Sequence, residues 1–250
     1  IKGQVEQHDR TGHGRQVPAK TAGRERYQRS AADRHRDSVD VCGVDRVWVF
    51  WKEGLRSGAL MSTHFRTVSR LPPFQQGGLD SLCGLYSIIN AERFINHSSD
   101  EETQQIFDDL VNFLARRKLL SKLLVGGIIH TEMLMILDKV VGKQRIANVY
   151  VPWRGVPNPD LTTFWKSIQF FLDGTPRRAV ILGLDGYHDH WTVIESITNR
   201  TIILYDSALI KRLPRSSCTT AYDTWKRKHL LLPAQTYFLS NEVLLGSQYY

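Results

Sequence analysis

The chain has 250 residues, 42% of them hydrophobic and 23% charged, which is enough apolar material for one sizeable folded core. It lacks a run of about 18 apolar residues. Its three cysteines (Cys42, Cys83 and Cys218) form no CxxC pair, which excludes a disulfide-stapled mini-domain and a structural zinc site. We therefore expect a cytoplasmic protein with reduced thiols, no secretory signal and no membrane partner.

The positive charge is concentrated at the N-terminal end of the chain. There are 33 Lys+Arg against 25 Asp+Glu, a formal net charge of +8. Residues 1–70 contain 14 basic and 8 acidic residues, a net of +6, whereas residues 71–250 contain 19 and 17, a net of +2. Because the second part is nearly balanced, nucleic acid is expected as a partner only through the basic N-terminal segment.

Residues 1–60 are predicted to be a basic, disordered arm. Residues 1–38 contain only isolated apolar positions with no helical or strand period, so they cannot bury enough surface to offset the entropy lost on ordering. A short apolar stretch at 39–51 could add a strand or a docked helix. Met61 directly precedes the patterned region, which raises the hypothesis that translation begins there and that the arm is dispensable.

A single folded domain is predicted for residues 71–250, where regular elements are separated by turns of ordinary length. Its first part is helical. Apolar residues three and four positions apart form buried stripes, and Ser99 with Glu102 forms a capping box. The helices are expected at residues 82–95, directly after Ser99, at 131–141 and at 161–172.

Strands dominate the second part of this domain. They are predicted from runs of β-branched and aromatic residues bounded by Gly, Pro, Asn or Asp. The runs lie at residues 145–153, 178–184, 190–197, 201–207 and 235–240. A block of helices followed by a block of strands is typical of an α+β domain with a mainly antiparallel sheet.

Cys83 lies where the glycine-rich segment QQGGLDSLCGLYS (75–87) turns into the first predicted helix. Unpaired amides and the positive end of the helix dipole favour a thiolate at such a position, although free cysteines are more often buried apolar residues. Gln76 precedes Cys83 by seven residues. The glycines between them allow the Gln76 amide to fold back beside the sulfur and join the Cys83 backbone amide in an oxyanion hole.

A base and its orienting acid are predicted on a hairpin formed by HDHWTVIESITNRTIILYDS (188–207). His190 opens the first strand and Asp206 ends the second. His190 and Asp206 lie on one face of the hairpin if the loop has three residues centred on Asn199, so that Ile197 faces Thr201, or if a strand contains a bulge. A regular two-residue loop would put Asp206 on the opposite face. The site therefore requires an odd loop or a bulge. His188 has the same strand parity, but we favour His190 because a regular buried strand continues from it.

The glutamine, the cysteine at a helix start, the histidine and the acid follow one another in the order found in papain-like cysteine peptidases, which the chain resembles over roughly residues 71–240. Its DSLCG and HWTVI...ILYDS segments are most similar to bacterial papain-fold proteins related to bacteriocin-leader peptidases. The resemblance implies a papain-like fold, with an N-terminal helical part whose cysteine helix packs on the sheet. It also implies Cys83 as nucleophile, His190 as base, Asp206 as orienter and Gln76 as oxyanion donor.

Two features depart from the papain pattern. Papain-like enzymes commonly have five residues between the glutamine and the cysteine, whereas six separate Gln76 from Cys83 and seven separate Gln75 from it. Asp80, three residues before Cys83, also gives the chain a similarity to ovarian-tumour-type deubiquitinases, in which the backbone of that loop shapes the oxyanion hole. Asp80 could equally cap the helix that follows.

The leading hypothesis is a thiol hydrolase that cleaves a peptide or isopeptide bond in a protein or peptide substrate. It would work through an acyl-enzyme, with no metal or organic cofactor. A transglutaminase, a deamidase or an acyltransferase would use the same residues. The alternative from another class is a non-enzymatic protein-binding module with a basic arm that contacts nucleic acid.

Overall fold

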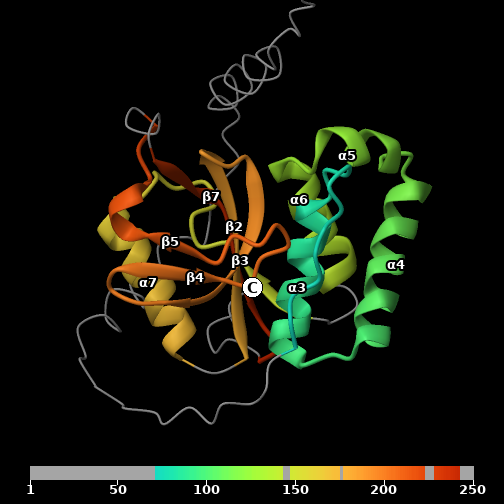
Figure 1. The fold of residues 1–250 in the computed structure, drawn as a ribbon, viewed down its shortest axis with the longest axis horizontal. Helices are drawn as coiled ribbons and strands as arrows, with labels where there is room; N and C mark the ends of the chain where they lie inside the picture. Colours follow the sequence, from blue (N-terminus) through green and yellow to red (C-terminus); the bar gives the residue numbers. More distant parts are fainter. Residues whose placement is uncertain (1–70, 143–146, 175–176, 223–227, 243–250) are drawn as a thin grey trace, which may run out of the picture. The chain divides into compact units, whose positions relative to one another are not determined.

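The computed structural model describes residues 71–142, 147–174, 177–222 and 228–242 of the chain. Helices pack on an open, largely antiparallel sheet (Figure 1). The α+β class predicted from the order of helices and strands is therefore confirmed. The predicted arm at 1–60, the apolar stretch at 39–51 and Cys42 lie outside the described residues.

Side-chain caps start two of the helices. The Ser99 hydroxyl accepts a hydrogen bond from the Glu102 amide at 3.2 Å, and the Glu102 carboxylate accepts from the Ser99 amide at 2.8 Å, so the predicted capping box is present. Asp160 caps a later helix by accepting from two backbone N–H groups. The helices are α3 (Cys83–Asn96), α4 (Asp100–Arg116), α5 (Leu120–Gly126), α6 (His130–Ile136), which continues as a π-helical turn (Leu137–Gly142), and α7 (Leu161–Asp173).

The strands form one sheet in the order β1-β7-β2-β3-β4-β5, with β6 beside the start of β7. Every pairing is antiparallel except that of β6 with β7. The strands are β1 (Asn148–Tyr150), β2 (Arg178–Gly186), β3 (His190–Ile197), β4 (Thr201–Leu204), β5 (Arg212–Pro214), β6 (Cys218–Thr219) and β7 (His229–Ser240).

Both faces of the sheet are covered. Helix α3 contacts β2 and β3 on one side, where α4 to α6 lie on the same side as α3, and α7 contacts the same strands from the other side (Figure 1). Trp191 and Tyr237 belong to the core beneath α3, whereas Phe238 stacks on Phe171 of α7 with ring centroids 4.3 Å apart. A central strand buried on both faces reads as a continuous apolar run, as the sequence of β2 does.

The bounds predicted for three elements are wrong. In the strand predicted at 145–153, only Asn148–Tyr150 is a strand among the described residues, and Trp153 packs from a loop against Phe164 at 4.8 Å between centroids. Strand β4 ends at Leu204 instead of 207 because the Asp206 side chain bonds the backbone beyond it. The last strand begins at His229 instead of 235.

Helix α5 and the short strands β5 and β6 were not predicted, since elements of two to seven residues carry little periodic signal.

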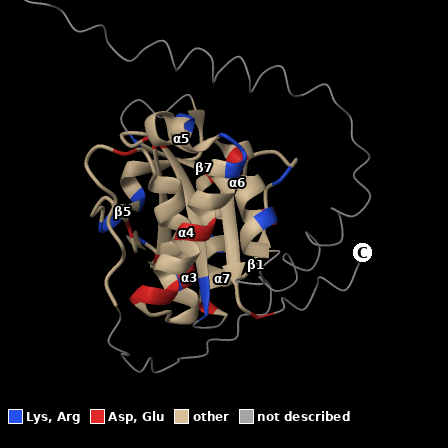
Figure 2. Cartoon of the chain, turned by 90° about the vertical axis from the view of Figure 1, so that its right-hand side faces the viewer, with Lys and Arg blue, Asp and Glu red and all other residues tan. Residues whose placement is uncertain are grey.

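Charges of both signs occur on the helical face that carries α3 to α6 (Figure 2). The acidic residues Asp100, Glu101 and Glu102 lie in the first turn of α4, where they favourably face the positive end of its dipole. Among the described residues, no helix has the length and apolar character that crossing a membrane requires.

Candidate active site

Cys83 is the first residue of α3, as the sequence predicts. The preceding residue, Leu82, makes no side-chain cap, and the first turn of the helix contains no acidic residue. The amide groups of this turn are therefore not used by a capping side chain and can face an anionic oxygen. Cys83 packs against the core but is only partly buried.

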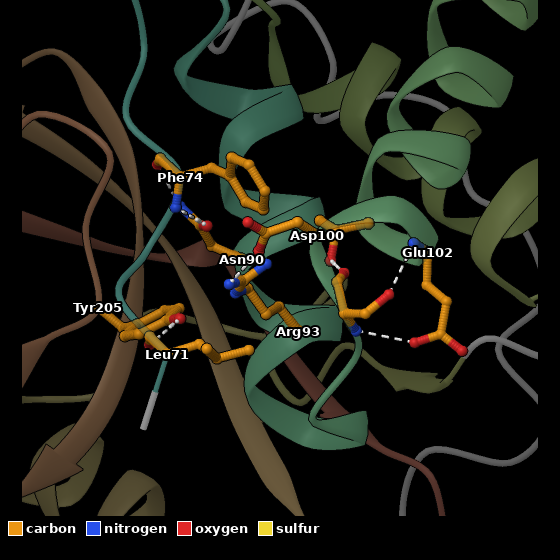
Figure 3. A network of polar contacts seen from close by, with 9 residues as sticks. Leu71, Phe74, Asn90, Arg93, Asp100, Glu102 and Tyr205 are labelled. Carbon is orange, nitrogen blue, oxygen red and sulfur yellow. Dashed lines mark hydrogen bonds and ion pairs between the residues drawn. The ribbon is translucent and has the colours of Figure 1, made fainter. Parts of the chain in front are cut away.

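The segment that leads to Cys83 is tied down along α3 and the sheet (Figure 3). Asn90, which is fully buried, accepts from the Phe74 amide at 2.8 Å and donates to the Phe74 carbonyl at 2.9 Å. The Tyr205 hydroxyl donates to the Leu71 carbonyl at 2.7 Å. Arg93 lies over the Phe74 ring and pairs with Asp100 at 2.6 Å. These contacts fix the backbone just before Gln76.

Gln76 lies next to the residue that follows the proposed orienting acid. Its backbone N–H donates to the Ser207 carbonyl at 3.2 Å. Its side-chain Oε1 lies 3.5 Å from the Ser207 hydroxyl. Because Oε1 faces Ser207, the NH2 end of the same amide is the part that can donate to a bound oxyanion. The neighbouring Gln75 is exposed.

Asp80 does not cap the helix, so that expectation is wrong. Its Oδ2 accepts from the Gly77 amide at 2.9 Å and its Oδ1 from the Leu82 amide at 3.0 Å. Both bonds lie within the loop before α3. An aspartate that accepts from the amide two residues later closes a turn of its own and so competes with capping. Asp80 therefore shapes the loop that presents Cys83.

The hairpin uses a two-residue loop together with a bulge. Ile197 pairs with Ile202 rather than with Thr201, which gives the loop that by itself would turn Asp206 to the wrong face. The register then shifts between Ile194 and Ser196, so that Ile194 pairs with Leu204. The extra residue restores the alignment on which the site depends. The bulge is one of the two solutions expected from the sequence; the three-residue loop is not found.

His190 and Asp206 are in direct contact and both are buried. His190 Nε2 donates to Asp206 Oδ1 at 2.7 Å, and the residues are 8% and 3% exposed. The other carboxylate oxygen, Oδ2, accepts from the amides of Ala208 and Ile210 at 2.8 and 3.1 Å. These backbone bonds hold the Asp206 carboxylate in place. The carboxylate in turn keeps a proton on Nε2 of the His190 ring.

The electrostatics of this pair favour an imidazolium beside a carboxylate. Burial alone would lower the pKa of His190, but the hydrogen bond and negative charge of Asp206, together with the neighbouring Cys83, raise the pKa to about 9. Burial would raise the pKa of Asp206, but the hydrogen bond and positive charge of His190 outweigh it and lower the pKa. Because Nε2 is bound to Asp206, Nδ1 is the ring nitrogen left to exchange a proton with Cys83.

His188 and Cys218 lie in surroundings that differ from those of His190 and Cys83. His188 stacks on His229 with ring centroids 5.3 Å apart. Cys218 is buried and donates to the Pro214 carbonyl, and burial raises the pKa of its thiol to about 12. Cys218 is therefore a protonated core thiol at neutral pH.

One part of the site was not foreseen from the sequence. The last turn of α5 supports the loop before Cys83: the Ser81 amide and hydroxyl donate to the Leu124 and Val125 carbonyls, each at 3.1 Å. On its other side, the Ile128 carbonyl accepts from the Trp191 indole at 2.7 Å. These are backbone carbonyls, which carry no sequence signature.

Comparison with protein-family models, with curated proteins and with solved structures found no match for this chain.

Proposed function

We propose that the protein is a papain-fold thiol hydrolase that cleaves a peptide or isopeptide bond through Cys83, His190 and Asp206. One observation supports this most strongly: the His190 ring is hydrogen-bonded to the Asp206 carboxylate, and Cys83 lies close enough to the same ring to raise its pKa. A nucleophile, a base and a group that orients the base are the minimum for covalent acyl transfer.

In the proposed reaction, the thiol proton already resides on His190 in the resting enzyme, and the Cys83 thiolate attacks the carbonyl carbon of the scissile bond. The negative charge on the carbonyl oxygen is stabilised by the Cys83 backbone amide and the NH2 group of Gln76. His190 then returns its proton to the leaving amine. Water attacks the acyl-enzyme with His190 as base, which releases the acid product and regenerates the thiol.

The site chemistry is tested by labelling with iodoacetamide at pH 7 and mapping the modified peptides by mass spectrometry. Cys83 is expected to react at least tenfold faster than Cys218, which is buried and protonated. His190→Ala should slow the labelling of Cys83 itself, whereas Cys218→Ala should leave the rate of Cys83 labelling unchanged. Equal labelling of Cys83 and Cys218 in the wild-type protein would refute selective activation and favour a non-enzymatic binding module.

The reaction is tested by incubating wild-type protein and Cys83→Ala with a peptide library. New peptide termini that form only with the wild-type protein are expected. Glutamine residues heavier by about 1 Da, or new amide cross-links, with no new termini would instead identify a deamidase or a transglutaminase that uses the same residues. The Cys83→Ala variant should keep the wild-type circular-dichroism spectrum, because the residue is only partly buried.

A further inference from the structure

A cavity of about 520 Å³, open to solvent, lies near the turn of the β3–β4 hairpin, and three of its seven lining residues are basic. Its wall includes three cationic side chains, those of Arg200, Arg215 and Lys228. None of its lining residues belongs to the Cys83 site. His190 begins β3 and the cavity lies beyond its last residue, so about 23 Å of extended strand separates the two.

The two arginines are held near each other by the backbone. The Arg215 amide donates to the Arg200 carbonyl at 2.8 Å, which joins the start of the 3-10 turn after β5 to the hairpin loop. The Arg215 guanidinium donates to the Thr162 hydroxyl at 2.9 Å and lies 5.4 Å from the Trp165 ring. A guanidinium fixed by stacking and by one hydrogen bond loses little entropy when it binds an anion with its remaining donors.

The positive charge of the cavity is not neutralised within the described part of the chain. No described carboxylate lies within 4.0 Å of the three cations. Asp160, which precedes the lining residue Leu161, is turned to α7 and accepts from Thr162 and Thr163. Cys218 also lines the cavity, and its raised pKa of about 12 keeps it uncharged there.

We propose that this cavity binds a small ligand through a phosphoryl or diphosphoryl group. Two guanidinium groups and one ammonium group match an oxyanion with two or more negative charges. The Ser216 hydroxyl and the Asn199 amide add neutral donors, since Asn199 Oδ1 accepts from Gln169 and leaves its NH2 end to face the ligand. The volume is in the range of small-molecule sites. This proposal is independent of the function proposed for Cys83.

Isothermal titration of the full chain with pyrophosphate, and separately with ADP, tests the proposal. Saturable binding with a Kd below about 1 mM is expected for pyrophosphate at 150 mM salt. Tighter binding of ADP would identify a nucleotide as the source of the diphosphate, and equal binding would identify the diphosphate group itself. Both results support the site, whereas no saturable binding of either probe would overturn it.

Matched variants locate the binding. Arg200→Gln and Lys228→Gln should each weaken pyrophosphate binding at least fivefold. Arg212→Gln is the control, because Arg212 is an exposed cation on the nearby strand β5 that does not line the cavity. Arg215 is left intact because it also contacts Thr162 and Trp165. An equal loss in all three variants would show general charge attraction and refute the site.

Discussion

Gln76 and Ser207, which are 131 residues apart in the chain, are joined through both backbone and side chain. The Gln76 amide donates to the Ser207 carbonyl at 3.2 Å, and Gln76 Oε1 lies 3.5 Å from the Ser207 hydroxyl. Since Ser207 follows Asp206, this contact joins the loop before Cys83 to the end of the hairpin that carries the acid. The proposed oxyanion donor and the proposed orienting residue are thus positioned by the same short segment.

Gln76→Ala is expected to lower kcat for peptide cleavage by about 100-fold while changing KM little, because the amide would donate mainly to the oxyanion of the transition state. Gln75→Ala is the matched control, since Gln75 is the exposed neighbour and should retain activity within about twofold. Steady-state kinetics on both variants measure this. A larger loss in Gln75→Ala would transfer the oxyanion role to Gln75.

His190→Ala and His188→Ala separate the two histidines that the sequence leaves as candidates for the base. His190 bonds Asp206, whereas His188 stacks on His229. Loss of the base should reduce kcat/KM by roughly 1,000-fold or more. His188→Ala should change it by less than about threefold. Comparable losses in both variants would argue against His190 as the base at this site.

Asp206→Asn is expected to make folding stability respond less to pH. The pKa of His190 is raised from 6.5 to about 9 in the folded protein, so its stabilising effect is fully present below pH 6.5 and is lost as pH rises through about 9. The lowered pKa of Asp206 stabilises the fold above its ordinary value of 3.8, and this effect is lost as pH falls.

Denaturant unfolding of wild-type protein and Asp206→Asn at pH 7 and pH 10 measures this effect. Replacing the carboxylate should cost roughly 3 kcal/mol of unfolding free energy at pH 7, where it faces a charged imidazole. The difference between the two proteins should shrink at pH 10, where that imidazole is neutral. A difference that is the same at both pH values would show that the pair does not carry the charge inferred here.

Gly84→Ala tests how closely the start of α3 is packed. A Cβ at this position would lie 2.9 Å from Ile128 Cδ1 and 3.2 Å from Met133 Cε, so one of these groups would have to move. We expect a loss of roughly 1–3 kcal/mol in unfolding free energy, measured by urea denaturation. Gly78→Ala is the control, because a Cβ there meets nothing within 4 Å. Equal stability of the two variants would show that the contact with Ile128 and Met133 is not constraining.

The sequence alone determined the fold class and the four candidate site residues. The helical spacing of apolar residues and the capping residues indicated α3, α4 and α7. A buried stripe and a capping box are local properties of the chain. The position of Cys83 at a helix start followed from the same local signals. Counting residues along the hairpin showed that His190 and Asp206 could meet only if the loop had an odd number of residues or a strand contained a bulge.

Tertiary structure decided between alternatives that local signals leave equal. The bulge between Ile194 and Ser196, not a longer loop, aligns His190 with Asp206, because packing on both faces of β3 fixes its register. Asp80 bonds its own loop instead of capping α3 because that loop is held against the Leu124 and Val125 carbonyls. Such contacts join backbone groups that are distant in the chain. Because backbone groups are the same at every residue, the sequence contains no signal for these contacts.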